Sequence, residues 1–469
     1  MNCLPKPQNH WWNICLLLLG LSAASTSARV FNVVNTNDSG ANLKPGNLRA
    51  AIIEANRLGG GNVIFLGRAP EAKHRSSPAA WTFHLNRAGV DENAALTGDL
   101  DVLRGNLTII GVGSNVVIDA TGLGDRVFQV FTNAKLTLQN LTITGGRAPQ
   151  AQPGSFYASA RQAENGGAIE NAGTVSLKNC ILNDNASGAG NFNPGNSGGR
   201  GGAGGGAIMN IGTLVVNDSE VLNNSAGDGY DGTQGGNGGG ILNGGSCSMT
   251  NCLVIGNASG NGGAPGGNAF GFAGSGGSGG GIVNFGTMVM SRCTVSNNIT
   301  GSGENGGQPG SGSVNALPGA SGGNGGDGAG IYNEGFLMLI SSTVTFNFNG
   351  YGGNGGNSLG VKGGHGGAGG NGAGIYNAGR AQVVDSPIHS NVAGIGGSGG
   401  DSYGGDGGTG GDGGSGGGVF TRKDAFIGLT NVRVEMNSAG SGGSGGSAHG
   451  SGIAGDAGAD GVAANIGGY

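Results

Sequence analysis

Carboxylates at short spacing are the residues of this sequence that suggest chemistry, because paired acids exchange protons and grouped acids bind calcium. In the glycine-rich half, Asp401, Asp406 and Asp412 lie five and six residues apart. Residues 396–403 (GGSGGDSY) match a calcium-binding nonapeptide once, but such repeats bind calcium in tandem copies. We therefore predict no cofactor, and calcium at these three aspartates is the alternative.

A second group of acids lies near the N-terminus, where an acid pair or a calcium ion would fit: Asp91, Glu92, Asp99 and Asp101. Other acids fall at scattered positions of the repeat described below: Glu170, Asp184, Asp218, Glu220, Glu334, Asp385 and Glu435. The histidines His365, His389 and His449 have no partner at metal-ligand spacing. We interpret the scattered acids as solvated surface charges and assign no catalytic residue.

The elements that must position these side chains come from a repeat. Six copies begin at an isoleucine that follows two small residues: Ile169, Ile208, Ile241, Ile282, Ile331 and Ile375. Two residues after each start stands an asparagine: Asn171, Asn210, Asn243, Asn284, Asn333 and Asn377. Sixteen residues after each start stands another: Asn185, Asn224, Asn257, Asn298, Asn347 and Asn391. A divergent copy starts at Val130, and a last copy starts at Val419 and needs two extra residues to reach Asn437.

Apolar residues alternate with polar residues inside each copy, as at Val175 and Leu177 and again at Leu214 and Val216. Period two predicts strands with one buried face. Short strands on a constant repeat cannot bury their own faces alone, and they stack best as a parallel β-helix. We expect the asparagines to occupy turns, where Asn tolerates left-handed geometry, and to bond one another in ladders along the axis.

Glycine makes up 113 of the 469 residues, and most of it fills inserts that follow the constant part of each copy. All inserts leave after the second asparagine, so we expect them on one side of the solenoid. Runs such as 352–374 and 396–418 permit polyglycine II, a three-residue helix whose glycines bond between neighbouring strands. Flexible loops are the alternative. With only 12 prolines, the chain is not collagen.

The sequence divides into four parts. Residues 1–28 contain a short apolar run (14–24) between Lys6 and small residues, which predicts a signal peptide and therefore export. Residues 29–126 are expected to form irregular first coils and a cap, with a helix over 47–57 that covers the open first coil. Residues 127–437 hold the repeats, and residues 438–469 form a Gly/Ser/Ala-rich tail without a firm strand.

Four cysteines follow the signal peptide: Cys180, Cys247, Cys252 and Cys293. Three of them share one position of the repeat, and we interpret all four as small buried thiols. A disulfide between Cys252 and Cys293 on successive coils is the alternative, because strand spacing is within disulfide reach.

The formal net charge of −5, without clustered Lys and Arg, excludes a nucleic-acid surface. We expect no membrane span after removal of the signal peptide, and a monomer.

Two segments resemble known bacterial families. Residues 46–52 (GNLRAAI) resemble the CSLREA-type motif at the N-terminus of large secreted β-helix proteins. The repeats resemble those of polymorphic outer-membrane proteins, which pair GGAI with FxxN. GGAI stands verbatim at 166–169 and 205–208, and FxxN has an aliphatic residue first, as in Leu182 to Asn185. The resemblance implies a right-handed parallel β-helix and export. Only 32 residues follow Asn437, so we do not expect the membrane barrel of that family.

These observations favour a secreted or cell-surface, adhesin-like module without catalytic activity, which would contact extracellular glycans or surface proteins. The alternative is a β-helix carbohydrate-active enzyme, either a polysaccharide lyase or a glycosidase. Such an enzyme needs a cluster of carboxylates on adjacent coils, and we find no such cluster in the sequence.

Overall fold

The protein is described here from a computed structural model, which covers residues 28–38, 46–68, 80–90, 92–113, 115–152, 162–191, 201–265, 272–308 and 317–462. Of the predicted signal peptide, only residue 28 is described. Asp91 and the end of the tail, residues 463–469, also lie outside the described residues.

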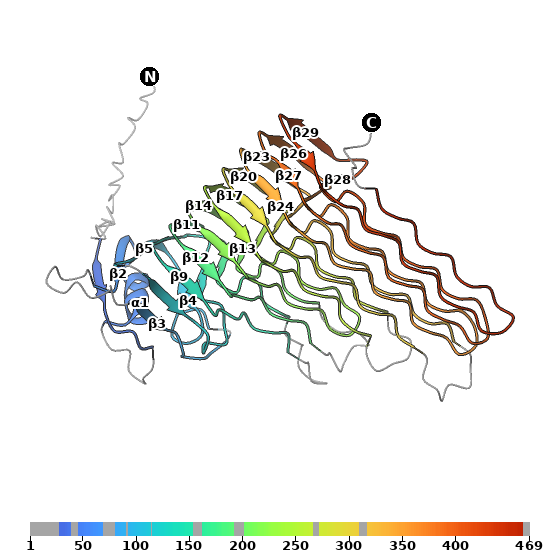
Figure 1. Ribbon diagram of the computed structural model, residues 1–469. Helices are drawn as coiled ribbons and strands as arrows, with labels where there is room; N and C mark the ends of the chain where they lie inside the picture. Colours follow the sequence, from blue (N-terminus) through green and yellow to red (C-terminus); the bar gives the residue numbers. More distant parts are fainter. Residues whose placement is uncertain are drawn as a thin grey trace, which may run out of the picture.

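The chain folds as a right-handed parallel β-helix, in which each coil adds one strand to each of three parallel sheets (Figure 1). Sheet A contains β1 (Val30–Val33), β2 (Gly61–Leu66), β5 (Gly105–Gly111), β8 (Ala134–Gln139), β11 (Thr174–Lys178), β14 (Thr213–Asn217), β17 (Ser246–Thr250), β20 (Thr287–Ser291), β23 (Phe336–Ile340), β26 (Arg380–Val384) and β29 (Phe426–Thr430). Sheet B contains β4 (Leu100–Val102), β7 (Phe128–Val130), β10 (Ile169–Asn171), β13 (Ile208–Asn210), β16 (Ile241–Asn243), β19 (Ile282–Asn284), β22 (Ile331–Asn333), β25 (Ile375–Asn377) and β28 (Val419–Thr421). Sheet C contains β3 (Trp81–His84), β6 (Val116–Asp119), β9 (Thr142–Thr144), β12 (Ile181–Asn183), β15 (Glu220–Leu222), β18 (Leu253–Ile255), β21 (Thr294–Ser296), β24 (Thr343–Thr345), β27 (Ile388–His389) and β30 (Val434–Glu435).

Successive coils stack in register, so that one position of the repeat forms a column along the axis. Val175 pairs with Leu214, for example, and Leu177 pairs with Val216. All four of these side chains are buried. The alternation seen in the sequence therefore fills one continuous core inside the solenoid.

The divergent first copy starts two residues earlier than the sequence suggested. Ile169 pairs with Phe128, and Val130 pairs with Asn171. The register recovers in the next strand, where Val175 pairs with Leu136. The connection between β7 and β8 is therefore two residues longer than the same connection in the next coil. Val130 is aliphatic, like the isoleucines that start the other copies, so the sequence pattern placed the start there.

Two columns of asparagine run through the interior, each joined by hydrogen bonds from coil to coil. In the first, Asn210 Nδ2 donates to Asn243 Oδ1 at 2.7 Å, and Asn243 Nδ2 donates to Asn284 Oδ1 at 2.8 Å. In the second, Asn298 Nδ2 donates to Asn347 Oδ1 at 3.0 Å. Each column satisfies buried amides along the axis, as stacked Asn ladders do.

The ladder asparagines do not occupy left-handed turns. The positive φ angles fall on neighbouring corner residues, such as Asn179, Asp218 and Arg292, with φ of 50° to 53°. A glycine before each sheet B strand forms another corner, as at Gly205 with φ of 65°. The corners therefore turn the chain, and the buried ladder asparagines bond the coils together.

Helix α1 (Leu48–Leu58) covers the open end of the first coils. Asn47 caps it by accepting a hydrogen bond from the Ala50 N–H at 2.8 Å, and the chain turns away at Gly59 with φ of 64°. Leu48, Ile52 and Ala55 share its buried face. The sequence predicted a helix over 47–57, and the structure has it at nearly the same residues.

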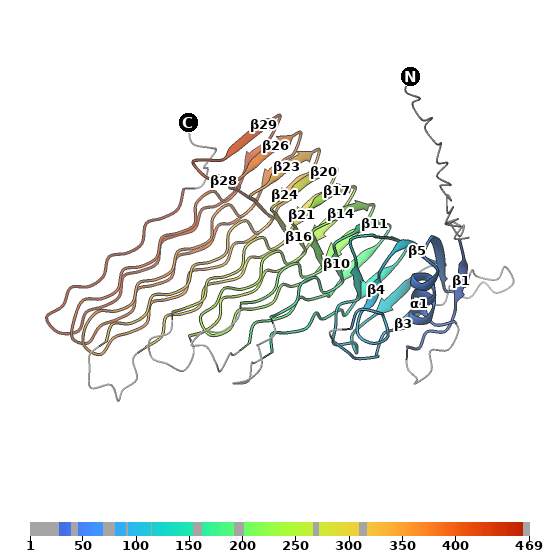
Figure 2. The same cartoon turned by 180° about the vertical axis from the view of Figure 1, so that it is seen from behind.

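The glycine-rich inserts form a second structure, here called the glycine layer, on one side of the β-helix (Figure 2). Its described parts are residues 188–191, 201–205, 227–238, 260–265, 272–279, 301–308, 317–328, 350–372, 394–416 and 440–462. Each of the longer inserts runs out and back as a hairpin, and its arms bond to their neighbours at every third residue. In one hairpin, Gly411 donates to the carbonyl of Gly397 at 2.8 Å, and Gly408 donates to that of Gly400 at 2.9 Å.

The same hairpin also bonds to the preceding insert, since Gly397 donates to the carbonyl of Gly367 at 2.8 Å. Bonds between strands at every third residue are the pattern of polyglycine II. Of the two expectations for the inserts, the structure shows the hydrogen-bonded layer. The described part of the tail, residues 438–462, joins this layer without a strand.

The four described cysteines are free and buried in this structure, which agrees with the expected small buried thiols. Within the described ranges, no helix combines the length and the apolar character needed to cross a bilayer.

Candidate functional site

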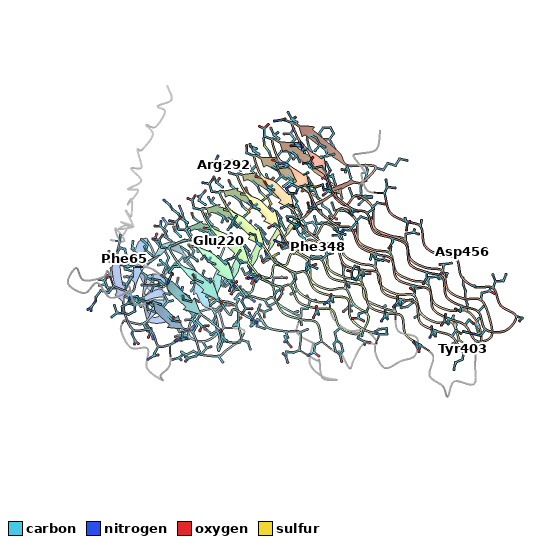
Figure 3. The ribbon with its side chains drawn as sticks, in the orientation of Figure 1. Phe65, Glu220, Arg292, Phe348, Tyr403 and Asp456 are labelled. Atoms are coloured by element: carbon cyan, nitrogen blue, oxygen red, sulfur yellow. The ribbon has the colours of Figure 1, made fainter. Side chains whose placement is uncertain are left out.

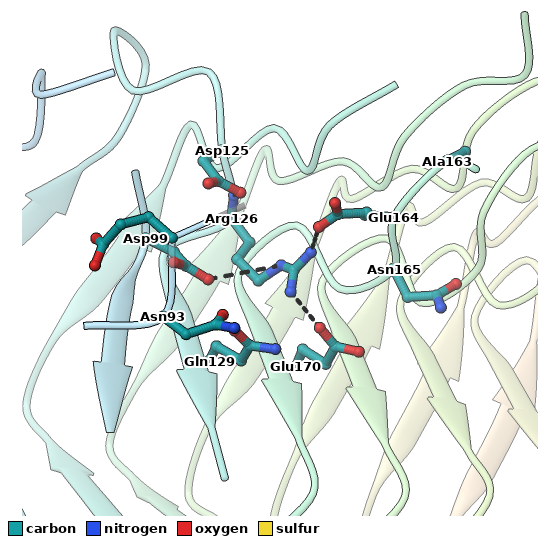
Figure 4. Close-up of a pocket in the computed structure, with 10 residues that line it drawn as sticks. Asn93, Asp99, Asp125, Arg126, Gln129, Ala163, Glu164, Asn165 and Glu170 are labelled. Carbon is teal, nitrogen blue, oxygen red and sulfur yellow. Dashed lines mark hydrogen bonds and ion pairs between the residues drawn. The ribbon is translucent and has the colours of Figure 1, made fainter. Parts of the chain in front are cut away.

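A polar cavity of about 360 Å³ lies near the N-terminal end of sheet B, beside the start of the glycine layer (Figure 4). Its lining is strongly acidic and contains Glu92, Asn93, Asp99, Asp125, Arg126, Gln129, Ala163, Glu164, Asn165 and Glu170. These residues come from three successive coils, which the parallel register brings to one edge.

Arg126 lies at the centre of the cavity and is the cation of the cluster. Its guanidinium forms ion pairs with Glu164 and Glu170, and its Nε lies 3.9 Å from Asp99 Oδ2. The Arg126 side chain is only 4% exposed. A buried cation needs such compensation, because an unpaired charge away from water is costly.

Sheet B sets the positions of the residues around Arg126. Asp101 on β4 pairs with Gln129 on β7, and Glu170 on β10 pairs with Gln129 from the other side. These three residues therefore form one column. Arg126 lies two residues before the start of β7 at Phe128, which places it between the coils that carry Asp99 and Glu170.

Helix α1 fixes the segment that carries Asp99. Arg49 forms a buried ion pair with Asp38, with Nε to Oδ1 at 2.8 Å. Its guanidinium also donates to the carbonyls of Ala95, Gly98 and Asp99 at 2.8 to 3.1 Å. Arg49 belongs to the segment 46–52, so this segment positions one wall of the cavity.

Two buried acids of the cluster bind protons more tightly than usual. Burial raises the pKa of Asp99 to about 8, and repulsion from Asp101 and Asp125 adds to this, against the attraction of Arg126. Burial likewise raises the pKa of Asp101 to about 7, although a hydrogen bond from the Ala95 N–H opposes the shift. At neutral pH, Asp99 is therefore mainly a neutral carboxylic acid.

The other carboxylates of the cavity have partners of their own. Glu92 accepts hydrogen bonds from the backbone N–H groups of Ala94, Leu96 and Thr97 at 2.6 to 2.9 Å. Asp125 accepts from the Arg126 N–H at 2.7 Å. Chemically, the site offers a neutral acid beside carboxylates that a guanidinium holds in place, and such a set can bind hydroxyl or amine groups.

The sequence predicted the site only in part. It singled out Glu92, Asp99 and Asp101, and the structure places all three at or directly beside the cavity. It treated Glu170 as a solvated surface charge, whereas Glu170 is paired with Arg126. The misplaced start at Val130 hid the column that joins Asp101, Gln129 and Glu170. The ion pair of Arg126 with Glu164 could not be predicted from the repeat, because neither residue stands at a repeated position.

The aspartates named as calcium candidates lie in the glycine layer. Asp401, Asp406 and Asp412 each accept a hydrogen bond from a backbone N–H of the next insert, at 2.7 to 2.9 Å. In the part of the chain that the structure describes, no three His, Cys, Asp or Glu side chains are grouped as a metal site requires.

Comparison with known proteins gives structural likeness alone. No family model and no curated protein matches the chain. Pectate lyase Pel9A superposes with a TM-score of 0.36 at 12% identity, covering 88% of this chain and 79% of the lyase. The A-module of the Azotobacter vinelandii mannuronan C-5 epimerase AlgE6 gives a TM-score of 0.32 at 14% identity, covering 89% and 94%.

Tailspike protein 3 of bacteriophage CBA120 gives a TM-score of 0.27 at 10% identity, covering 87% of this chain and 59% of the tailspike. At these TM-scores, the likenesses carry no argument about activity. The fold assignment rests on the three parallel sheets of the chain itself.

Proposed function

We propose that the chain is an exported β-helix protein that acts at the cell surface as a non-catalytic adhesion or structural module. The glycine layer carries this proposal. Its arms bond to one another at every third residue, so it holds its shape and presents ordered rows of side chains away from the β-helix. The finer resemblance to polymorphic outer-membrane repeats and to the CSLREA-type segment supports export and surface exposure.

The rows on the layer suit contact with an extended partner. Ser398 stands between the glycine positions of its arm, beside Asn354 and Ser444 of the adjacent inserts. Its N–H donates to Asn354 Oδ1 at 2.8 Å, and its hydroxyl accepts from the Ser444 hydroxyl at 3.0 Å. Tyr403 lies near the end of the layer farthest from the strands, and Asp456 lies part of the way back along it (Figure 3). We expect extracellular glycans or surface proteins as the partners, because hydroxyl and amide rows bind polar polymers.

The state of the cavity also supports a non-catalytic role. Arg126 holds Glu164 and Glu170, and backbone amides hold Glu92, so these carboxylates stabilise the fold where they are. A general base needs a carboxylate that is free to reach its substrate.

Binding by the purified chain 29–469 tests the proposal. We expect retention on immobilised extracellular polysaccharides or on intact cells, and reduced retention by the double variant Asn354→Ala with Ser398→Ala, which alters one face of the layer. Ser176→Ala on the outer face of sheet A is the matched control. Equal retention of both variants would show that this face of the layer is not the binding surface. If the parent chain is not retained at all, the adhesion proposal is wrong.

A second candidate function is that of a carbohydrate-active enzyme acting at the Arg126 cavity. The observation in its favour is Asp99, a protonated acid beside ionised carboxylates, because environments that separate two acid pKa values can assign acid and base roles. Robust cleavage of a neutral or charged polysaccharide, lost in Asp99→Asn, would establish it over the adhesion proposal. We expect no turnover.

A further inference from the structure

In one column of the β-helix interior, each coil contributes either a cysteine or a serine. Its members are Cys180, Ser219, Cys252, Cys293, Ser342 and Ser386. The common pattern is that a side chain accepts the N–H of the preceding coil, as Ser342 Oγ accepts from Cys293 at 3.0 Å. Within this column, Cys252 and Cys293 are the two thiols on adjacent coils.

We propose that Cys252 and Cys293 are a disulfide-forming pair that links two coils when the exported chain folds in the presence of a small-molecule disulfide. Adjacent strands fix the geometry. Each cysteine directly precedes a strand of sheet C, and those strands pair Leu253 with Thr294. The Thr294 N–H also donates to the Cys252 carbonyl at 2.9 Å.

In-register residues of neighbouring strands have their Cα atoms about 4.8 Å apart, inside the range of about 4.4 to 6.8 Å for disulfides. Both side chains point into the core, with Cys252 0% exposed and Cys293 2% exposed. The two cysteines therefore lie one strand spacing apart, with both side chains buried.

The two thiols also affect each other in the core. Their interaction raises the pKa of Cys252 and lowers the pKa of Cys293. Burial raises the pKa of Cys180 to about 11 and that of Cys247 to about 12. These opposite shifts arise from the contact between the two thiols, in agreement with their positions on adjacent coils.

The exchange balances with oxidised glutathione as the oxidant. The thiolate of one cysteine attacks one sulfur of the glutathione disulfide, which forms a mixed disulfide and releases one glutathione thiolate. The other cysteine then loses its proton and attacks the sulfur of the first cysteine, which releases the second glutathione thiolate. The two protein thiols are oxidised, glutathione disulfide is reduced to two thiols, and the two protons end on them.

Burial in the finished core means that this exchange must occur before the two coils close. The cross-link would join residues 41 apart in sequence and would close the intervening insert of the glycine layer into a covalent loop. Export into a compartment that maintains disulfides would favour it. The inference is independent of whether the layer binds glycans.

Thiol counting after refolding tests the inference. The chain 29–469 is unfolded, reduced, and refolded with either reduced or oxidised glutathione, and its free thiols are then titrated in denaturant. We expect four thiols after the reduced refolding and two after the oxidised refolding, with peptide mapping placing the cross-link at Cys252 and Cys293. Four thiols under both conditions, or a cross-link at Cys180 or Cys247, would overturn the proposal.

Two serine variants separate the pair from the rest of the column. Cys293→Ser is expected to fold, since Ser342 occupies the same position one coil later, and to keep all three of its thiols under the oxidised condition. Cys180→Ser is the matched control and should fall from three thiols to one. Equal thiol losses in the two variants would also contradict the pairing.

Discussion

The protonation of Asp99, near the N-terminal cap, is determined mainly by its burial. The carboxyl is held beside Arg126 and two other acids, and its folded pKa of about 8 lies above its ordinary value of 3.8. The folded state therefore binds this proton more tightly than the unfolded chain does. The stabilisation it gives is complete below about pH 4 and is lost as the pH rises through about 8.

We therefore expect the stability of the N-terminal cap to fall between pH 4 and pH 8, by at most about 1.4 kcal/mol per pH unit for this one proton. Asp99→Asn should flatten the profile and exceed the parent chain in stability at pH 9. Amide hydrogen exchange of helix α1 across this pH range measures the effect. Asp424→Asn, at an exposed acid in the last coil, is the control. An unchanged slope in Asp99→Asn would show that Asp99 titrates normally.

The ladder asparagines carry a second prediction for single residues. Asn284 Nδ2 donates to Asn333 Oδ1 at 2.8 Å and to the Phe336 carbonyl at 3.0 Å, and its Oδ1 accepts from Asn243. Asn284→Ala removes these hydrogen bonds, at a cost of about 1–3 kcal/mol for each buried group that is left without a partner. We expect a large drop in the unfolding midpoint in urea. Asn106→Ala on the exposed face of β5 should change the midpoint little, and similar midpoints for the two variants would contradict a structural role for the ladder.

At the scale of elements, the glycine layer depends on the missing side chains of its glycines. A Cβ atom at Gly397 would lie 2.0 Å from the carbonyl oxygen of Gly353 in the preceding insert. Such contact forces the arms apart and breaks hydrogen bonds that use the same carbonyl groups. The positions between the glycine pairs, such as Ser398, face outward and accept side chains.

Gly397→Ala should therefore open the layer locally, with a loss of about 1–3 kcal/mol or more, as overpacking gives elsewhere. Ser398→Ala should have little effect. Amide hydrogen exchange of residues 394–416 distinguishes them: slow exchange in the parent chain and in Ser398→Ala, and fast exchange in Gly397→Ala. Fast exchange of these amides in the parent chain would show that the inserts behave as flexible loops.

The sequence predicted those elements whose contacts repeat in every coil, and it failed where a contact depends on how neighbouring coils are placed. Period two and the asparagine marks located the strands, because register repeats the same contacts in each coil. Val130 misled the register because a turn two residues longer is invisible to a hydrophobic pattern. The inserts allowed two structures, because glycine runs fit both a layer and loops until the neighbouring insert is placed. Arg126 and Glu164 were missed because their pairing spans coils and follows no repeated position.

At the scale of the whole molecule, the β-helix and the layer share one translation along the axis. Ile282 pairs with Ile331, and Ile331 pairs with Ile375. The glycine layer follows the same order, with inserts of different length bonded to their neighbours. Each coil with its insert is thus one unit whose contacts are with the units before and after it, as in other solenoids.

This arrangement predicts that one entire unit can be removed. Deleting residues 331–374 joins Gly330 to Ile375, brings Ile282 next to Ile375, and lets Asn284 continue the ladder through Asn377. Because stability in a solenoid is roughly a sum over units and their interfaces, we expect a folded chain with a similar β-sheet signal per residue in circular dichroism and a slightly lower unfolding midpoint. Deleting residues 331–362 instead removes the strands of that coil and the outgoing arm of its insert but keeps the returning arm, residues 363–372. The returning arm then has no partner arm in its own insert, and it should disrupt the layer. If the full-unit deletion unfolds as readily as the partial one, then the coils are not equivalent units, and the layer would have to be held by contacts that extend beyond neighbouring coils.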